Sequence, residues 1–530
     1  MLLATLAAST AAYRADARPP ESPSAQRKPK KPPRKPAPSK PRAPSAVPAA
    51  WHPSEPATVE PPRPITFDLA IDKTTLPNGL RVVLNPEPAL PVIALAVAYA
   101  AGPKHETQDQ QGFAAAAANA MSGFGLSPPS AERLQQLAIR GASLSTVENT
   151  DQVVFLDLLP AGALEFGLWF EAERMLKARV TEQALEAQRR RVRAQDQHAM
   201  SLHNLAAVQG RVEQLAFEGF FPYEHDCTGQ TSLASAPVSN VEAFRSTWYV
   251  PENAVIAITG AFDPELAMRA VHRFFRPVPR SAGLPVVNPP PLPDQTNQRS
   301  AAIRSELTNN PVLAYGWAVP AHRQPEHDAL GMAASILGEG PDSRIVRKLA
   351  KARLPVSIAV QLDDRTGPSL LLVALQAAND ASLLEARKIV DDEVDALARL
   401  GPTTDEMRSL WRDSQQHLFD ALGPADQRAL RLASLELLHG DARLVYAEQT
   451  RPLSISKDDI RKAVARFLSP TRRSMVQANA TGRVLERPVA PSAPAPTVTH
   501  PGAHHASAAP GAKRKPHTPA KPPAKKRKKK

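Results

Sequence analysis

This sequence is poor in cysteine and contains no long apolar run. A single cysteine, Cys227, stands among 530 residues, so an internal disulfide and a cysteine-rich zinc module are both excluded. No stretch reaches the roughly 18 consecutive apolar residues that a membrane-spanning helix needs. Apolar residues still make up 42% of the chain, which at this length is enough for two or more domains with packed cores.

Proline is abundant, and it is concentrated at the two ends. Of the 55 prolines, 16 lie in residues 1–64 and 10 in residues 488–530. The ends also carry the positive charge, +7 over residues 1–64 and +11 over 481–530, which leaves about −5 for residues 65–480. Such segments cannot bury enough apolar surface to offset the entropy of ordering, so residues 18–65 are predicted to be a disordered linker and 481–530 a disordered basic tail. The high pI therefore does not indicate a nucleic-acid-binding domain.

The first residues resemble a signal peptide, predicted over residues 1–17. A short apolar run is followed by Ala15-Asp-Ala17, a small-residue cleavage pattern, although no Lys or Arg precedes the run. We expect export to the periplasm or cell envelope, with a cytoplasmic location left open. The basic tail is expected either to be solvated or to touch an anionic envelope surface, and no specific nucleic acid is implied.

The body between the tails divides into two similar halves, residues 66–280 and 300–480, joined by a Pro-rich linker over 281–299. Each half opens with an apolar strand, Leu90–Tyr99 in one and Asn310–Val319 in the other. In each half an acidic loop and a small-residue helix follow. This repetition predicts a duplicated domain of the α+β class, with an antiparallel sheet flanked by helices in each copy.

Local signals place several helices within these halves. An amphipathic stretch predicts a helix over Leu164–Lys177. Asp263-Pro264 predicts the start of a helix that runs to Phe275, with the aspartate as its cap. Gly401-Pro402 predicts the end of another.

Several short motifs, in this order and spacing, resemble the insulinase/pitrilysin-type metallopeptidases, also called inverzincins. The resemblance covers roughly residues 70–478 and is carried by Leu76–Val82, Gly102–Glu106, Gly112–Ala114, Gly141-Ala142 with Asp151, Phe221–Tyr223 with Gly229, Trp248–Asn253, Gly260 with Asp263, Leu337–Gly340 and Ser343-Arg344. It implies two homologous domains of the insulinase/mitochondrial-processing-peptidase type.

Active members of that family carry H-x-x-E-H on a helix, where two histidines bind zinc and the glutamate activates the bound water. In this sequence the first histidine falls on Ala115, the glutamate on Ala118 and the second histidine on Asn119. The distal zinc-binding glutamate of the family falls on Gln195. Alanine has no donor atom and neutral amides are poor zinc ligands, so we expect no metal ligand, no catalytic residue and no cofactor.

Few other residues are candidates for chemistry. Arg344 is the one substrate-binding candidate, although the tyrosine that tends to follow the Ser-Arg pair in active relatives is replaced by Val356. His105-Glu106 is expected to be a solvated loop pair, and Arg189–Arg191 a solvated helix face. Glu224–Cys227 is not expected to bind a metal, because adjacent residues seldom converge on one ion.

The resemblance therefore favours a non-catalytic subunit. It would form a hetero- or homodimer with an insulinase-family subunit, with a zinc-bearing relative as the favoured partner, around a chamber that takes peptide or unfolded polypeptide. A stand-alone peptide-binding or envelope assembly protein is the alternative. An active metalloendopeptidase is the least favoured reading.

Overall fold

The computed structural model describes residues 60–484, apart from residues 125–131, 133–134, 137, 203–204, 225–229, 282, 305–309 and 481. The predicted signal peptide, most of the predicted linker, the basic tail and Cys227 lie outside the described residues. Among the described residues, no helix is both long and apolar enough to cross a membrane.

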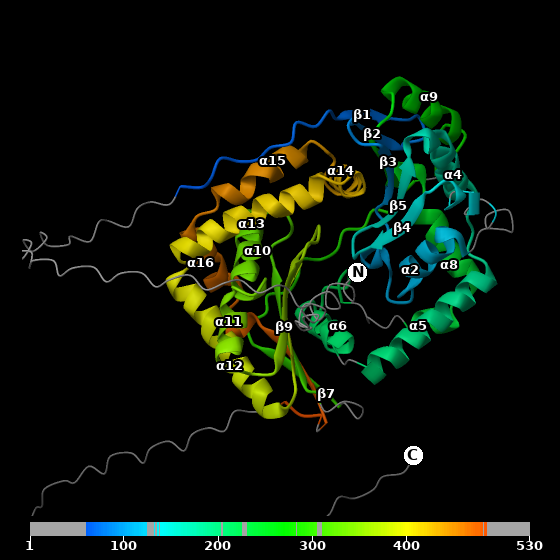
Figure 1. Ribbon diagram of the computed structural model, residues 1–530. Coiled ribbons are helices and arrows are strands. Elements are labelled where there is room, and N and C mark those ends of the chain that lie inside the picture. The colour runs from blue at the N-terminus through cyan, green and yellow to red at the C-terminus, as the bar shows by residue number, and fades with distance from the viewer. Residues whose placement is uncertain are drawn as a thin grey trace, which may run out of the picture. The chain divides into compact units, whose positions relative to one another are not determined.

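The first half is built on a six-stranded sheet with the order β1-β2-β6-β3-β5-β4 (Figure 1). Its strands are β1 (Asp72–Thr75), β2 (Arg81–Pro86), β3 (Val92–Tyr99), β4 (Ser143–Glu148), β5 (Val153–Pro160) and β6 (Ala254–Gly260). The helices in this part of the chain are α2 (Phe113–Asn119), α4 (Leu164–Lys177), α5 (Glu182–Leu202), α6 (Leu205–Ala216), α7 (Gln230–Ser235), α8 (Val238–Trp248) and α9 (Pro264–Phe275).

The second half is built on a five-stranded sheet with the order β7-β11-β8-β10-β9. Its strands are β7 (Arg299–Arg304), β8 (Val312–Val319), β9 (Val356–Asp363), β10 (Ser369–Ala377) and β11 (Ser474–Asn479). The helices are α10 (Pro325–Gly338), α11 (Arg344–Lys351), α12 (Asp380–Leu400), α13 (Thr404–Leu422), α14 (Ala425–His439), α15 (Leu444–Thr450) and α16 (Lys457–Phe467).

The two sheets share one topology, so the predicted α+β class of two similar domains is confirmed. The order β2-β6-β3-β5-β4 corresponds strand for strand to β7-β11-β8-β10-β9. The sheets are mixed rather than purely antiparallel, because β2 pairs with β6 and β7 with β11 in parallel. In both halves the parallel partner follows only after a long segment of three strands and several helices, in keeping with the long connection that parallel pairing requires.

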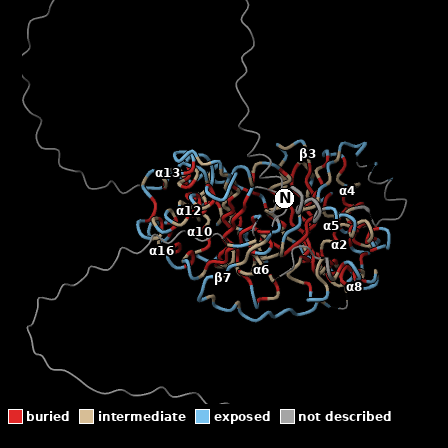
Figure 2. The backbone as a smooth tube through the Cα atoms, turned by 90° about the horizontal axis from the view of Figure 1, so that it is seen from below, coloured by how far each residue is buried: buried red, intermediate tan, exposed pale blue. Residues whose placement is uncertain are grey.

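The central strand of each sheet is apolar on both faces, because helices pack on both. In Figure 2 the buried residues lie mostly inside the two halves and the exposed ones mostly around the outside. In β3 the larger residues from Ile93 to Tyr99 face one core, while Ala94, Ala96 and Ala98 face another. Strand β8 alternates in the same way, and its Gly316 lets a helix approach closely. A Cβ at Gly316 would lie 2.3 Å from Val212 Cγ1, a distance that packed carbon atoms do not reach.

The helices on those small-residue faces are exchanged between the halves. Helix α14 belongs to the second half of the chain but packs on β3, β6 and β5 of the first sheet. Helix α6 belongs to the first half but packs on β8, β11 and β10 of the second sheet. Each sheet is thus completed by the corresponding helix of the other half.

Candidate functional site

The predicted zinc-binding segment forms a short helix with a nearly closed surface. Helix α2 starts after Gly112, whose φ of 89° lies in the left-handed region that favours glycine. Ala117 and Ala118 are 0% exposed, so the position of the family's catalytic glutamate is filled by packed methyl groups. Ala115 and Asn119 are half-buried and lie one turn apart on one face. We call Ala115, Ala118, Asn119 and Gln195 the vestigial zinc position.

A buried carboxylate holds the start of this helix. Glu106 accepts hydrogen bonds from the backbone N–H of Gly112 at 3.0 Å and of Ala114 at 2.7 Å. Burial raises the pKa of Glu106 to about 7, even though the backbone donors act in the opposite direction. The expectation of a solvated His105-Glu106 pair is therefore wrong: the first N–H groups of a helix need acceptors, and this carboxylate supplies them.

The neighbouring His105 is also part of the packed structure. Its ring lies 4.6 Å from the Trp248 ring, centroid to centroid, and its Nδ1 accepts the backbone N–H of Gly102 at 3.1 Å. Burial lowers the pKa of His105 to about 4. The imidazole is accordingly neutral at physiological pH and faces an aromatic ring.

A guanidinium stands beside the second histidine position. Arg191, on α5, donates a short hydrogen bond to Asn119 Oδ1, while Asn119 Nδ2 donates to the Ala115 carbonyl at 2.8 Å. Gln195 lies on α5 four residues further along, but its side chain is outside the described residues. Arg191, which the expected arginine-rich solvated face included, is exposed and nevertheless bonded to the vestigial zinc position.

These residues do not fit a zinc ion. Two of the positions present methyl groups, and the amide of Asn119 is already engaged on both of its polar atoms. A cationic guanidinium beside the position also opposes the approach of a divalent cation. Within the ranges that the structure describes, no cluster of three or more His, Cys, Asp or Glu residues could hold a metal elsewhere.

An open strand edge borders the vestigial zinc position. Strand β4 pairs with β5 on one side only, and the described residues place no strand against its other side. The turn that continues α2, η2 (Ala120–Phe124), approaches β4 through Ser122 Oγ, which lies 3.3 Å from Thr146 Oγ1. The backbone of β4 therefore offers hydrogen-bonding groups next to the helix that relatives use for zinc.

Other motif residues of the first half hold this region in place. Tyr249 Oη donates to the carbonyl of Ala114 in α2 at 3.2 Å. Asn253 Nδ2 donates to the carbonyls of Ala100 at 2.9 Å and Trp248 at 2.7 Å. The motif Trp248–Asn253 thus acts as a scaffold for α2 and β3.

Arg344 also has an internal partner. Its guanidinium makes a two-pronged contact with Glu406, with Nε to Oε1 at 2.7 Å and Nη2 to Oε2 at 2.8 Å. It donates further to the carbonyl of Gly401 at 3.0 Å. Arg344 ties α11 to the start of α13, and its proposed contact with substrate stays a prediction.

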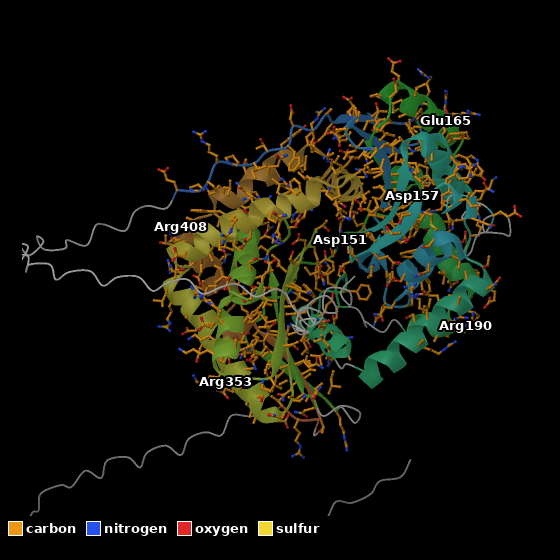
Figure 3. The ribbon with its side chains drawn as sticks, viewed as in Figure 1. Asp151, Asp157, Glu165, Arg190, Arg353 and Arg408 are labelled. Carbon is orange, nitrogen blue, oxygen red and sulfur yellow. The ribbon has the colours of Figure 1, made fainter. Side chains whose placement is uncertain are left out.

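A polar cluster around two buried side chains connects the two halves of the chain; we call Lys104, Asp151, Tyr223, Thr366 and Gly367 the joint. Asp151 is 2% exposed and is labelled between the halves in Figure 3. It accepts the backbone N–H of Thr366 at 2.8 Å and its hydroxyl at 2.7 Å, and pairs with Lys104 Nζ at 3.0 Å. Burial raises the pKa of Asp151, but these partners outweigh it and hold the pKa below its ordinary value.

The aromatic member of the joint fixes the same loop. The backbone N–H of Gly367 donates to Tyr223 Oη at 2.9 Å, and a Cβ at Gly367 would lie 2.8 Å from that oxygen. The adjacent Arg365 is 2% exposed, pairs with Glu213 of α6 at 2.6 Å and lies 4.8 Å above the Tyr223 ring. The turn between β9 and β10 is therefore gripped from several sides.

Sequence reasoning missed the joint. Asp151 and Tyr223 were recognised as parts of motifs, but nothing in the segment 363–367 marked it as their partner. The residues that pair across the joint lie 144 to 262 positions apart in the sequence, and no local pattern indicates such pairing. The one usable signal was a polar residue inside an otherwise apolar motif.

The middle of the chain matches a known family model. Residues 236–410 match the model described as "Peptidase M16 inactive domain". This range begins after α2 and α5, so the match does not include the vestigial zinc position. Among curated proteins, the chain is 23% identical over 344 residues to a zinc protease, PqqE, of Helicobacter pylori, covering 62% of this chain and 77% of that protein.

Solved structures with the same fold cover most of the chain. A protease from Helicobacter pylori superposes with a TM-score of 0.71 at 18% identity, covering 78% of this chain and all of that one. A peptidase M16 inactive domain from Pseudomonas fluorescens gives 0.69 at 16% identity, covering 79% of this chain and 100% of that one. The first half of the periplasmic protease PqqL from Escherichia coli gives 0.61 at 15% identity, covering 80% and 93%. At these identities the likeness concerns the fold.

Proposed function

We propose that this chain, an insulinase-family homologue, acts as a non-catalytic subunit that binds peptide and pairs with a zinc-bearing relative. The observation that carries the proposal is the vestigial zinc position. Methyl groups, an engaged amide and a guanidinium stand where a metal and a general base would have to be. The surrounding fold is retained, so the chain keeps the shape of a peptidase without the groups that hydrolysis needs.

The open edge of β4 supports peptide binding. An extended peptide can add to such an edge by backbone hydrogen bonds, with side chains read at alternate positions. Ser143 and Ser145 are exposed on β4. A short, polar edge of this kind disfavours aggregation. The edge lies beside α2, so a bound peptide would run past the vestigial zinc position.

The joint supports a scaffold role. It connects the two halves through the ion pair of the buried Asp151 with Lys104 and through several hydrogen bonds. If the two halves keep a fixed arrangement, the open edge of β4 keeps the same surroundings for a peptide and for a second subunit. Export, implied by the first residues and in keeping with a periplasmic structural relative, belongs to the same proposal.

The test is to purify the chain alone and together with a zinc-bearing relative from the same organism. We expect no bound zinc and no chelator-sensitive cleavage from the chain alone, and a stable complex with the relative whose cleavage of unfolded polypeptide exceeds that of the relative alone. Stoichiometric zinc with cleavage by this chain alone would overturn the proposal. A monomer or homodimer that binds peptide and ignores the relative would favour a stand-alone binding protein.

A further inference from the structure

We propose that Arg191 turns the vestigial zinc position into a binding site for a carboxylate on the peptide. This inference rests on the proposed function, because it specifies what the peptide presents to this chain. In active relatives a metal ion at this position polarises a carbonyl group. In this chain the guanidinium of Arg191 would instead bind a carboxylate.

The position of Arg191 on α5 brings it to the right place. Arg191 follows Gln188 by three residues and precedes Gln195 by four, so the three lie on one helical face. Gln188 is 6% exposed, which shows that this face of α5 packs inward at that position. The contact from Arg191 to Asn119 Oδ1 then fixes the guanidinium against α2. The cation therefore stands beside the residues that align with the zinc ligands of active relatives.

The guanidinium has donors to spare. A guanidinium carries five N–H groups in a fixed fork that matches a carboxylate. Among the described residues, Asn119 is the one hydrogen-bond partner of Arg191, and the side chain is exposed. By contrast, Arg189 on the same helix donates to Glu186, to the Leu233 carbonyl and to the Ala236 carbonyl. The guanidinium of Arg191 is thus held by Asn119 and has further N–H groups available to a ligand.

The open edge of β4 supplies the direction from which a ligand would come. Thr146 and Glu148 are two residues apart and so lie on the same face of β4. Thr146 approaches Ser122, next to α2, and Glu148 is close enough to Arg191 for their charges to interact. A peptide that adds to this edge would bring its end or a side chain within reach of the guanidinium.

Glu148 is the acidic group that a ligand would have to compete with. Desolvation raises the pKa of Glu148, and the nearby charge of Arg191 acts in the opposite direction. Among the described residues the two side chains form no direct ion pair, so Arg191 is not neutralised by contact. Removing the Glu148 charge should therefore strengthen the binding of a carboxylate, which gives the proposal a second, opposite test.

The experiment uses fluorescence polarisation with the full chain and fluorescein-labelled decapeptides in matched sets. One set ends in a free carboxylate, one in an amide, and one carries Glu or Gln inside the peptide. These arms distinguish a terminal carboxylate from an acidic side chain. The variants are Arg191→Gln, Glu148→Gln and, as the matched control, Arg190→Gln, an exposed neighbour on the same helix that is labelled in Figure 3.

We expect one carboxylate arm to bind wild-type chain about tenfold more tightly than its neutral counterpart, the size of one charge-assisted contact at an exposed site. Arg191→Gln should abolish that preference, Glu148→Gln should increase it, and Arg190→Gln should leave it unchanged. Equal binding of charged and neutral peptides, or a preference that survives Arg191→Gln, would overturn the inference while leaving peptide binding intact. Absence of binding to any peptide would overturn peptide binding and this inference together.

Discussion

The joint and the vestigial zinc position are built in opposite ways. In the joint, Asp151 is buried and satisfied by several partners contributed from both halves of the chain. At the vestigial zinc position, Ala115 and Asn119 are half-buried, and the polar contact to them comes from an exposed arginine. The joint fixes the two halves through satisfied polar groups, whereas the vestigial zinc position presents methyl groups and an engaged amide. This difference is in keeping with the non-catalytic role proposed above.

The largest expected effect of a substitution lies in the joint. Asp151→Ala removes the buried partner of an ion pair, so that Lys104 loses its counter-ion and the two donors of Thr366 lose their acceptor, and we expect the free energy of unfolding to fall by about 3–5 kcal/mol. Urea denaturation measures this. As control, Glu265→Ala removes an exposed ion pair with Arg269 and should change little. Equal effects of Asp151→Ala and Glu265→Ala would show that the joint stabilises the fold no more than an exposed ion pair does.

The next effect tests the exchange of helices. Leu432 of α14 is fully buried against the first sheet, so Leu432→Ala should reduce the free energy of unfolding by about 2–5 kcal/mol. Although Leu432 belongs to the second half of the chain, hydrogen exchange should show loss of protection in β3 and β6. Gln427→Ala on the same helix serves as control. Loss of protection confined to β8 and β10 would show that α14 does not complete the first sheet.

A third effect concerns the anchor of α2 and its dependence on pH. Because the pKa of Glu106 rises from 4.5 to about 7 on folding, its share of stability is present at low pH and is lost as pH rises from 4.5 through 7. Wild-type chain should therefore gain about 1–3 kcal/mol over Glu106→Gln when pH falls from 8 to 5. Denaturant unfolding at both values measures this. A difference independent of pH would mean that Glu106 is ionised throughout.

Near the joint, the pH dependence should have the opposite sign. His322 Nδ1 lies 3.3 Å from His439 Nε2 of α14, and burial lowers the pKa of His322 to about 4, with Asp364 opposing and Arg431, His327 and His439 assisting. A histidine with a lowered pKa loses its contribution as pH falls from 6.5 towards 4.

Wild-type chain should consequently lose about 1–2 kcal/mol relative to His322→Gln over that interval. The measurement is the same as for Glu106, carried out between pH 7 and pH 4.5. If the free energies of unfolding of Glu106→Gln and His322→Gln changed with pH just as that of wild type does, the predicted opposite pH dependences of the two regions would be wrong.

The smallest expected effect is that of zinc. A ligand at a hundred times its Kd stabilises a protein by about 2.7 kcal/mol, which a melting curve detects easily. We expect about 100 µM zinc, a concentration far above the Kd of structural zinc sites, to leave the melting temperature unchanged. EDTA should have no effect. A rise that EDTA reverses would show that a metal binds after all and would remove the contrast between the two regions.

Sequence patterns predicted much of the local structure. Helix Leu164–Lys177 has the predicted bounds, Asp263 caps α9 by accepting the N–H of Leu266 at 2.9 Å, and α12 ends at Gly401. These features depend on neighbours along the chain. The replacement of the zinc ligands rests on an aligned motif alone and stays a prediction.

Long-range features were not predictable in this way. The apolar face of α14 indicates that the helix packs on something, but amphipathicity does not say on which sheet. Glu106 looked solvated because its partners are backbone N–H groups of a helix that begins six residues later. Thr366 gave no signal at all, since its role depends on Asp151 in the other half.

The exchange of α6 and α14 has a consequence for biosynthesis. The last strand of the first sheet is complete at Gly260, but the helix that covers its small-residue face begins at Ala425. At ordinary translation rates the ribosome takes on the order of ten seconds or more to make the intervening segment. During that interval an apolar sheet surface stays exposed on the nascent chain, which makes it a target for a chaperone and means that neither half, expressed by itself, would have a complete core.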